Sequence, residues 1–235
     1  MRITLRHHFD FGADRRVVGD DLVRPEAWDA LRTRTDGAFA IARSREELDR
    51  AAESRTEIGA RARAVDAWLR ERKIATLASY GVGGGLLEAR LQHLDPECRL
   101  VLADYAPDTV EQLQALFPGS EVVRHDLLVD PPLPADAHLF HRIDTELSDE
   151  QWADVLQRFA AETVLVVATE VATARSFVQE LILRARSRRL TRAGWLRNRG
   201  AFEALWGATH DAAPLSLHDL EGWALTPRRA TPRRA

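Results

Sequence analysis

A run of glycines and two carboxylates stand at regular intervals in the middle of the chain. Gly81 and Gly83 interrupt an apolar stretch, Asp104 follows about 20 residues later, and Asp126 follows after a similar interval. Glycine lets the backbone pass close to a ligand, and a carboxylate accepts hydrogen bonds from paired hydroxyls or from an exocyclic amine. A ribose offers the first kind of donor and adenine offers the second. The spacing therefore indicates a nucleoside-binding site.

Each of these groups follows a short apolar segment with the pattern of a buried strand. Residues 74–78, 99–103 and 121–124 are such segments, and residues 137–140 and 163–168 continue the series. Stretches with helical spacing separate them. Alternation of this kind predicts an α/β fold: a doubly wound, mostly parallel Rossmann-like sheet with helices on both faces. Ligands bind at the carboxyl ends of the strands in such a sheet, where the glycines and acids stand.

The regions outside this alternation are less regular. Residues 1–45 mix loose apolar alternation with a charged stretch, and we expect an N-terminal arm or cap there. One helix is expected over residues 45–72. Residues 46–225 are expected to form one ligand-binding domain. Residues 226–235 repeat Thr-Pro-Arg-Arg-Ala and are expected to be a disordered tail.

An arginine-rich stretch at residues 184–199 has seven arginines and no acid. It could contact phosphate or RNA, but no RNA-binding module accompanies it. We interpret it as a helix end and loop that covers an acidic substrate or faces solvent. Nucleic acid is therefore not the expected partner.

The composition bounds the class of protein. The chain has 235 residues, 45% of them hydrophobic, with a net charge of −3, which suits one packed core. Cys98 is the single cysteine, so a disulfide framework is excluded. No signal peptide is evident, and no apolar run approaches the ~18 residues of a membrane span. We expect a cytoplasmic protein without a membrane segment.

The glycine run and the acids resemble motifs of the class I S-adenosylmethionine (SAM)-dependent methyltransferases. Residues 76–83 resemble the glycine loop that wraps the methionine part of SAM, and residues 102–105 resemble the motif whose acid binds ribose. Residues 124–127 resemble the motif that flanks adenine. Residues 137–149 and 163–168 resemble the fourth motif and the fifth strand. The resemblance covers about half of the chain, residues 58–169.

This resemblance implies a SAM-dependent methyltransferase that acts on O or N of a small-molecule metabolite and releases S-adenosylhomocysteine (SAH). The sequence does not determine the acceptor or the oligomeric state. The residues that the resemblance assigns to SAM binding are Ser79, Tyr80, Gly81, Gly83, Asp104, Tyr105, Asp126, Leu127 and His141.

Two departures from the family pattern affect the reactive groups. The acid that normally begins the glycine loop is absent, since Leu77 and Ser79 stand at its positions. The catalytic histidine of many plant-type members is also absent from the fourth motif. Catalytic roles are therefore predicted for His141, as a general base or cofactor contact, and for Asp144, which could orient a substrate amine or hydroxyl. Glu146, in the same loop, is interpreted as surface charge.

Other interpretations stay open. A non-catalytic SAM-binding, nucleoside-binding or partner-binding domain could retain the same fold, and the altered glycine loop favours it. An aminopropyl transferase would show an acid-rich amine site, which we do not find. A nicotinamide cofactor is disfavoured because Leu86 stands at the third glycine position. No metal site is predicted, because His125, His138 and His141 lack partners with metal-ligand spacing.

Overall fold

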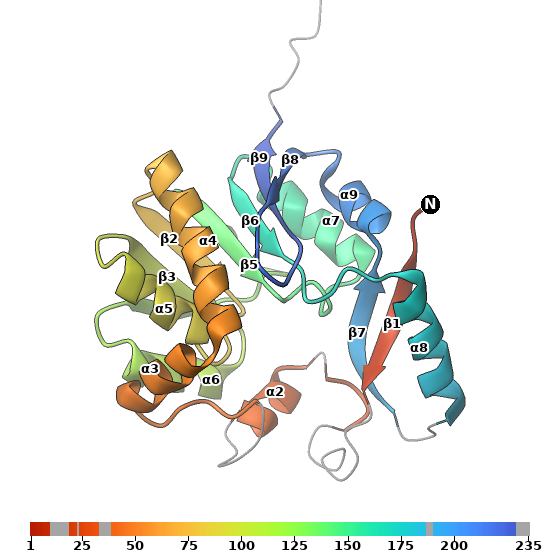
Figure 1. Cartoon of the computed structure of the whole chain (residues 1–235), viewed down its shortest axis with the longest axis horizontal. Helices are drawn as coiled ribbons and strands as arrows, with labels where there is room; N and C mark the ends of the chain where they lie inside the picture. Colours follow the sequence, from red (N-terminus) through yellow and green to blue (C-terminus); the bar gives the residue numbers. More distant parts are fainter. Residues whose placement is uncertain (10–18, 23, 33–38, 187–189, 229–235) are drawn as a thin grey trace, which may run out of the picture.

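A seven-stranded sheet forms the centre of the computed structural model, which describes residues 1–9, 19–22, 24–32, 39–186 and 190–228. The strand order is β4-β3-β2-β5-β6-β9-β8 (Figure 1). The first five strands in this order run parallel, and β9 is antiparallel to both of its neighbours. The predicted doubly wound fold is confirmed. The bounds are β2 Thr76–Tyr80, β3 Arg99–Asp104, β4 Glu121–Arg124, β5 Ala137–His141, β6 Val164–Val167, β8 His210–Leu215 and β9 Gly222–Pro227.

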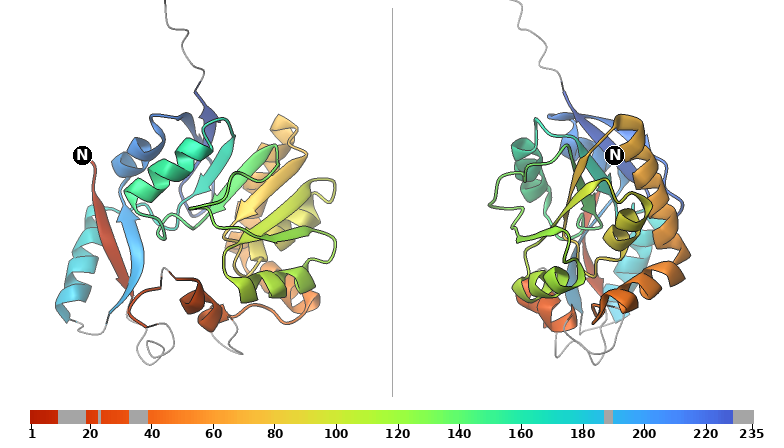
Figure 2. Two further views of the ribbon diagram at one scale, coloured as in Figure 1. Left: turned by 180° about the vertical axis from the view of Figure 1, so that it is seen from behind. Right: turned by 90° about the vertical axis from the view of Figure 1, so that its left-hand side faces the viewer.

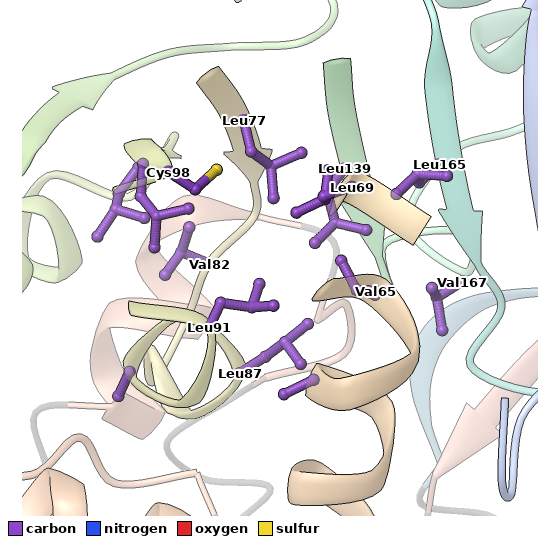
Figure 3. Close-up of a cluster of buried hydrophobic side chains, with 14 of the residues drawn as sticks. Val65, Leu69, Leu77, Val82, Leu87, Leu91, Cys98, Leu139, Leu165 and Val167 are labelled. Carbon is purple, nitrogen blue, oxygen red and sulfur yellow. The ribbon is translucent and has the colours of Figure 1, made fainter. Parts of the chain in front are cut away.

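Helices cover both faces of the sheet, as the right-hand view of Figure 2 shows. The helices on one face are α3 Arg45–Ser54, α4 Thr56–Arg72, α5 Leu86–Leu94 and α6 Pro107–Leu116, and those on the other are α7 Asp149–Arg158 and α9 Arg199–Trp206. Strand side chains alternate between the two cores, because successive residues of a strand face opposite ways. Leu77 packs beneath α4 and α5 with Val65 and Leu87 (Figure 3), whereas Ala78 joins the aromatic core beneath α7.

A smaller unit lies beside the main sheet. In it β1 (Thr4–Phe9) pairs antiparallel with β7 (Thr191–Arg197), and α8 (Ala174–Arg186) packs against β1 (Figure 1). Glu180 of α8 is buried and joins the layers by accepting a 2.7 Å hydrogen bond from Nδ1 of His8. Helix α2 (Pro25–Arg32) packs against α6. Residues 1–45 therefore contribute a strand and a helix that reach two different parts of the molecule.

The arginine-rich stretch corrects the sequence interpretation. Residues 191–197 form β7 rather than a loop, and Arg197 is 1% exposed. Its guanidinium pairs with Asp149 at 2.7 Å and donates to the carbonyls of Asp144 and Leu147. Gly194, with φ of +112°, lets β7 pass so close that an added Cβ would lie 1.7 Å from the carbonyl oxygen of Thr145. Through these contacts Arg197 joins the smaller unit to the main sheet, so its guanidinium is part of the interior.

Smaller differences concern boundaries. The helix expected over residues 45–72 is two helices, because Arg55 adopts extended backbone between α3 and α4. Strand β8 was not expected. A capping box begins α7: the side chain of Ser148 accepts from the backbone N–H of Gln151, and the side chain of Gln151 accepts from the backbone N–H of Ser148. Strand β9 extends to Pro227, and residues 229–235 of the expected tail lie outside the described part, so the domain division stays a prediction.

No described helix has both the length and the apolar character needed to cross a bilayer. Among those same residues, His, Cys, Asp and Glu side chains do not gather in threes around a point where a metal ion could sit.

Candidate functional site

The glycine loop begins at Gly81, directly after the carboxyl end of β2, which pairs in parallel with both β3 and β5. Strand β3 lies on one side of β2 and β5 on the other, so the strand order reverses at this point and leaves a crevice. Gly81 has φ of +64°, and an added Cβ would lie 2.4 Å from Ile143. Its N–H donates to the carbonyl of Ala103 at 2.8 Å, and that of Gly83 donates to Oδ2 of Asp104 at 3.0 Å. The loop is therefore bonded directly to the end of β3.

Two adjoining cavities open along this edge. The first, which we name the Tyr105 cavity, is about 320 Å³, and the second, the Glu88 cavity, is about 290 Å³. Arg32, Gly81, Ile143 and Glu146 line both cavities and thus form the division between them. The further walls of the Tyr105 cavity include Tyr80, Tyr105, Asp126, Leu127 and Gln151. Those of the Glu88 cavity include Phe9, Trp28, Phe39, Glu88, His141 and Thr169.

The carboxylate of Asp104 is already fully hydrogen-bonded. Nη1 of Arg32 lies 3.2 Å from each of its oxygens, and the N–H groups of Gly83 and Ala106 donate at 3.0 and 3.1 Å. A carboxylate accepts about four hydrogen bonds, so these donors saturate it. Helix α2 holds Arg32 in place, because Nη1 of Arg32 also donates to Oγ1 of Thr109 at 3.0 Å and the N–H of Thr109 donates to Asp29 at 3.3 Å. Asp104 itself lines neither cavity, whereas Arg32, with which it pairs, lines both.

The residues predicted to surround adenine lie together in the Tyr105 cavity. Oδ1 of Asp126 accepts from the N–H of Leu128 at 2.8 Å, which fixes the carboxylate in a turn beside Leu127. The hydroxyl of Tyr105 is buried and has no hydrogen-bond partner among the described residues. Burial raises the pKa of this phenol far above its ordinary value, and the charge of Glu146 acts in the same direction. The cavity thus presents a fixed carboxylate and an unpartnered hydroxyl.

The side chains of Ser79 and Tyr80 form hydrogen bonds with other buried groups of the protein. Ser79 is fully buried outside the walls of both cavities, and its Oγ donates to Oε1 of Glu88 at 2.7 Å. The hydroxyl of Tyr80 accepts from the N–H of Leu133 at 3.0 Å and lies 3.2 Å from Nδ1 of His138. Burial raises the pKa of Tyr80 to about 12. Of the two residues, Tyr80 reaches the wall of the Tyr105 cavity.

The structure separates the two residues that were predicted to be catalytic. His141 lines the Glu88 cavity, and its buried Nε2 lacks a partner among the described residues. Burial, aided by Arg142, lowers the pKa of His141 to about 3, so the ring is neutral at neutral pH. Asp144 lies outside both cavity walls. Its Oδ1 accepts from the N–H and Oγ1 of Thr169, both at 2.7 Å, which ties the loop after β5 to the end of β6.

Sequence reasoning missed three charged residues at the cavities. Arg32 gave no local signal, because its contact with Asp104 depends on how α2 docks. Glu88 could have been noticed as an acid on the same helical face as Leu91, which is buried. Glu146, interpreted as surface charge, lines both cavities instead. Burial raises the pKa of Glu146 to about 7, although the nearby Arg32 opposes this shift.

Comparisons with known proteins give structural matches alone. No protein-family model matches the chain, and no curated protein matches its sequence. Solved structures do match: PigF with SAH has a TM-score of 0.61 at 14% identity, over 92% of this chain and 65% of that one. Human N-acetylserotonin methyltransferase in complex with SAM matches with a TM-score of 0.58 at 16% identity, over 79% of this chain and 57% of that one. The mitomycin 7-O-methyltransferase MmcR matches with a TM-score of 0.56 at 23% identity, over 78% of this chain and 57% of that one.

These likenesses show the fold that the chain shares with SAM-dependent methyltransferases, as the sequence predicted. The chain spans between 57% and 65% of the length of these three structures. At such identities a likeness establishes fold and leaves the chemistry to the site.

Proposed function

We propose that this chain is a SAM-dependent methyltransferase that acts on an O or N atom of a small molecule. One observation carries the proposal: the glycine loop, Asp104 and Asp126 share one edge of a methyltransferase-type sheet, beside two adjoining cavities. The Tyr105 cavity would take the adenosine part of SAM and the Glu88 cavity would take the methionine part.

The described residues fit SAM, with one rearrangement. Asp126 and the unpartnered Tyr105 hydroxyl supply the polar groups that adenine requires, and the glycine loop allows close backbone approach. Asp104 would accept the ribose hydroxyls once Arg32 releases it. SAH is the expected product.

Methyl transfer needs little from the protein besides positioning. When bound, SAM would supply a methyl group that its sulfonium has already activated, and its own sulfur would leave as the thioether of SAH. The walls of the cavities hold the two reactants together and exclude water. Glu146, with a pKa near 7, is better matched than His141 to accept the acceptor's proton at neutral pH. His141 would then orient the acceptor through its neutral ring.

The Glu88 cavity favours a planar, apolar acceptor. Phe9, Trp28 and Phe39 line it, and Trp28 and Phe39 meet edge to face with ring centroids 5.7 Å apart. All three residues belong to residues 1–45, so we propose that this N-terminal segment forms the acceptor wall and that residues 46–225 bind SAM. We place the reaction in the cytoplasm, which suits the buried free thiol of Cys98.

A non-catalytic SAM-binding domain is the second candidate. The observation that favours it concerns the two residues predicted to be catalytic, because Asp144 lies outside both cavities and His141, with a pKa of about 3, is a poor base. Binding without turnover would support this alternative.

Calorimetric titration with SAH tests the proposal. We expect the wild-type protein to bind SAH and Asp104→Ala to bind it at least about a hundredfold more weakly, because charged hydrogen bonds to the ribose are lost. Since alanine leaves Arg32 buried without a partner, the double variant Arg32→Met/Asp104→Asn serves as a charge-neutral control that should fold and still bind poorly. Absence of wild-type binding at millimolar SAH would overturn the proposal. SAH release from SAM with a panel of phenols and amines separates the enzyme from the binding domain.

A further inference from the structure

Glu88 is a buried carboxylate without a cationic partner among the described residues. It is 2% exposed, and its side chain accepts from two neutral donors, Oγ of Ser79 at 2.7 Å and its own backbone N–H. A buried carboxylate is ordinarily paired with a cation or bonded by several donors, because removal of its charge from water is costly. Burial accordingly raises the pKa of Glu88 to about 7. The residue is therefore incompletely satisfied in the protein alone.

The position of Glu88 gives this carboxylate access to a ligand. It stands in the first turn of α5, directly after the glycine loop, and it lines the Glu88 cavity. Ser79, near the end of β2, fixes Oε1 of Glu88 through the hydrogen bond from its hydroxyl. The carboxylate is thus fixed at the wall of the cavity proposed for the methionine part of SAM.

The other charged and titratable groups leave this role to Glu88. Arg32, Arg55, His141, Arg142 and Glu146 line the same cavity, and Asp104 acts on Glu88 through space. The negative charge of Asp104 is already paired with Arg32, and His141 carries no charge that could attract an ammonium group. Glu146 lies at the division between the cavities.

We infer that Glu88 binds the α-ammonium group of the ligand's amino acid part and thereby replaces the acid that is absent from the start of the glycine loop. This inference rests on the proposed function, because it assigns one residue to one group of SAM. Residues 77 and 79 of β2 carry no acid, and Ser79 instead positions a carboxylate that comes from α5. The acid that the family pattern places on the strand would thus be supplied by the helix that follows it.

The test compares two ligands that differ in the amino acid part. SAH carries the ammonium group, and 5′-deoxy-5′-methylthioadenosine keeps the adenosine and thioether without it. We expect Glu88→Gln to weaken SAH binding by about ten- to a hundredfold and to leave binding of the methylthio nucleoside within about twofold. Glu111→Gln, on the exposed side of α6, is the matched control and should change neither. Equal weakening of both ligands, or of neither, would overturn the assignment.

A second measurement needs no variant. At pH 7 an ammonium group that docks on Glu88 should release a fraction of a proton, because the carboxyl must ionise to receive it. Titrations of the wild-type protein in two buffers of different ionisation enthalpy should show this release with SAH and not with the methylthio nucleoside. Identical proton release for the two ligands would count against Glu88. If neither ligand binds the wild-type protein, the proposed function itself fails, whatever the role of Glu88.

Discussion

Asp104 and Glu88 are buried to nearly the same extent on either side of one glycine loop, but they are partnered in opposite ways. Asp104 accepts from a guanidinium and two backbone N–H groups, whereas Glu88 accepts from neutral groups, the hydroxyl of Ser79 and its own backbone N–H. Burial raises the pKa of Glu88, while Asp104 has its charge balanced by Arg32. Equal burial therefore leaves one carboxylate saturated within the protein and the other in need of a cation. A ligand must displace a partner at Asp104 and supply one at Glu88.

The largest expected effect comes from removal of the cation that saturates Asp104. Arg32→Met should lower the free energy of unfolding of the ligand-free protein by about 3–5 kcal/mol, because it leaves a buried charge unpaired. The same variant should bind SAH more tightly, since the ribose no longer competes with a guanidinium. Denaturant unfolding and calorimetric titration measure the two effects. Arg50→Met, at an exposed position of α3, is the control. Weaker SAH binding by Arg32→Met would show that Arg32 supports the ligand instead of competing with it.

The unpartnered carboxylate should appear in the pH dependence of stability. The folded pKa of Glu88, about 7, lies above its ordinary value of 4.5, so the folded state holds its proton more tightly. Stability is thus lost as pH rises from about 4.5 to 7, by up to roughly 3 kcal/mol. Glu88→Gln should remove this part of the loss. Unfolding free energies at pH 5 and pH 8 give the comparison, and parallel profiles for variant and wild type would contradict the assigned burial.

The smallest effect concerns Asp126, a carboxylate that is neither saturated nor fully buried. Asp126→Asn keeps an oxygen for the N–H of Leu128 but would present N–H groups to the adenine amine. We expect SAH to bind about tenfold more weakly, with a smaller change for the inosine analogue, which has no such amine. Competition titrations with the two ligands decide this, and an equal loss for both would remove Asp126 from adenine recognition.

The sequence predicted the parts of the site whose signals are local. A short apolar run followed by glycine or aspartate indicates a buried strand with that residue at its carboxyl end. Gly81, Asp104 and Asp126 were all recognised from this pattern. The assignment of these residues to SAM is a prediction that binding experiments must test.

The remaining parts depend on contacts between distant segments. The contact of Arg32 with Asp104 requires α2 to dock on α6, and nothing within residues 25–32 encodes that destination. Residues 191–197 resembled a basic loop because the burial of Arg197 depends on Asp149, which lies far away in the chain. Glu88 was missed although its partner Ser79 is near in the chain, because its role can be inferred only once the hydrogen bond between the two side chains is known.

The pairing of β1 with β7 has a consequence for how the chain assembles. Ile3 donates its N–H to Asn198 across 195 positions of sequence. At typical translation rates the first strand is made roughly ten to forty seconds before its partner. During that interval its edge is unpaired, and the polar side chains of three consecutive residues, Arg6, His7 and His8, would discourage it from pairing with other chains. Because Phe9 at the end of this strand lines the Glu88 cavity, the side of the cavity that Phe9 lines should be the last to form.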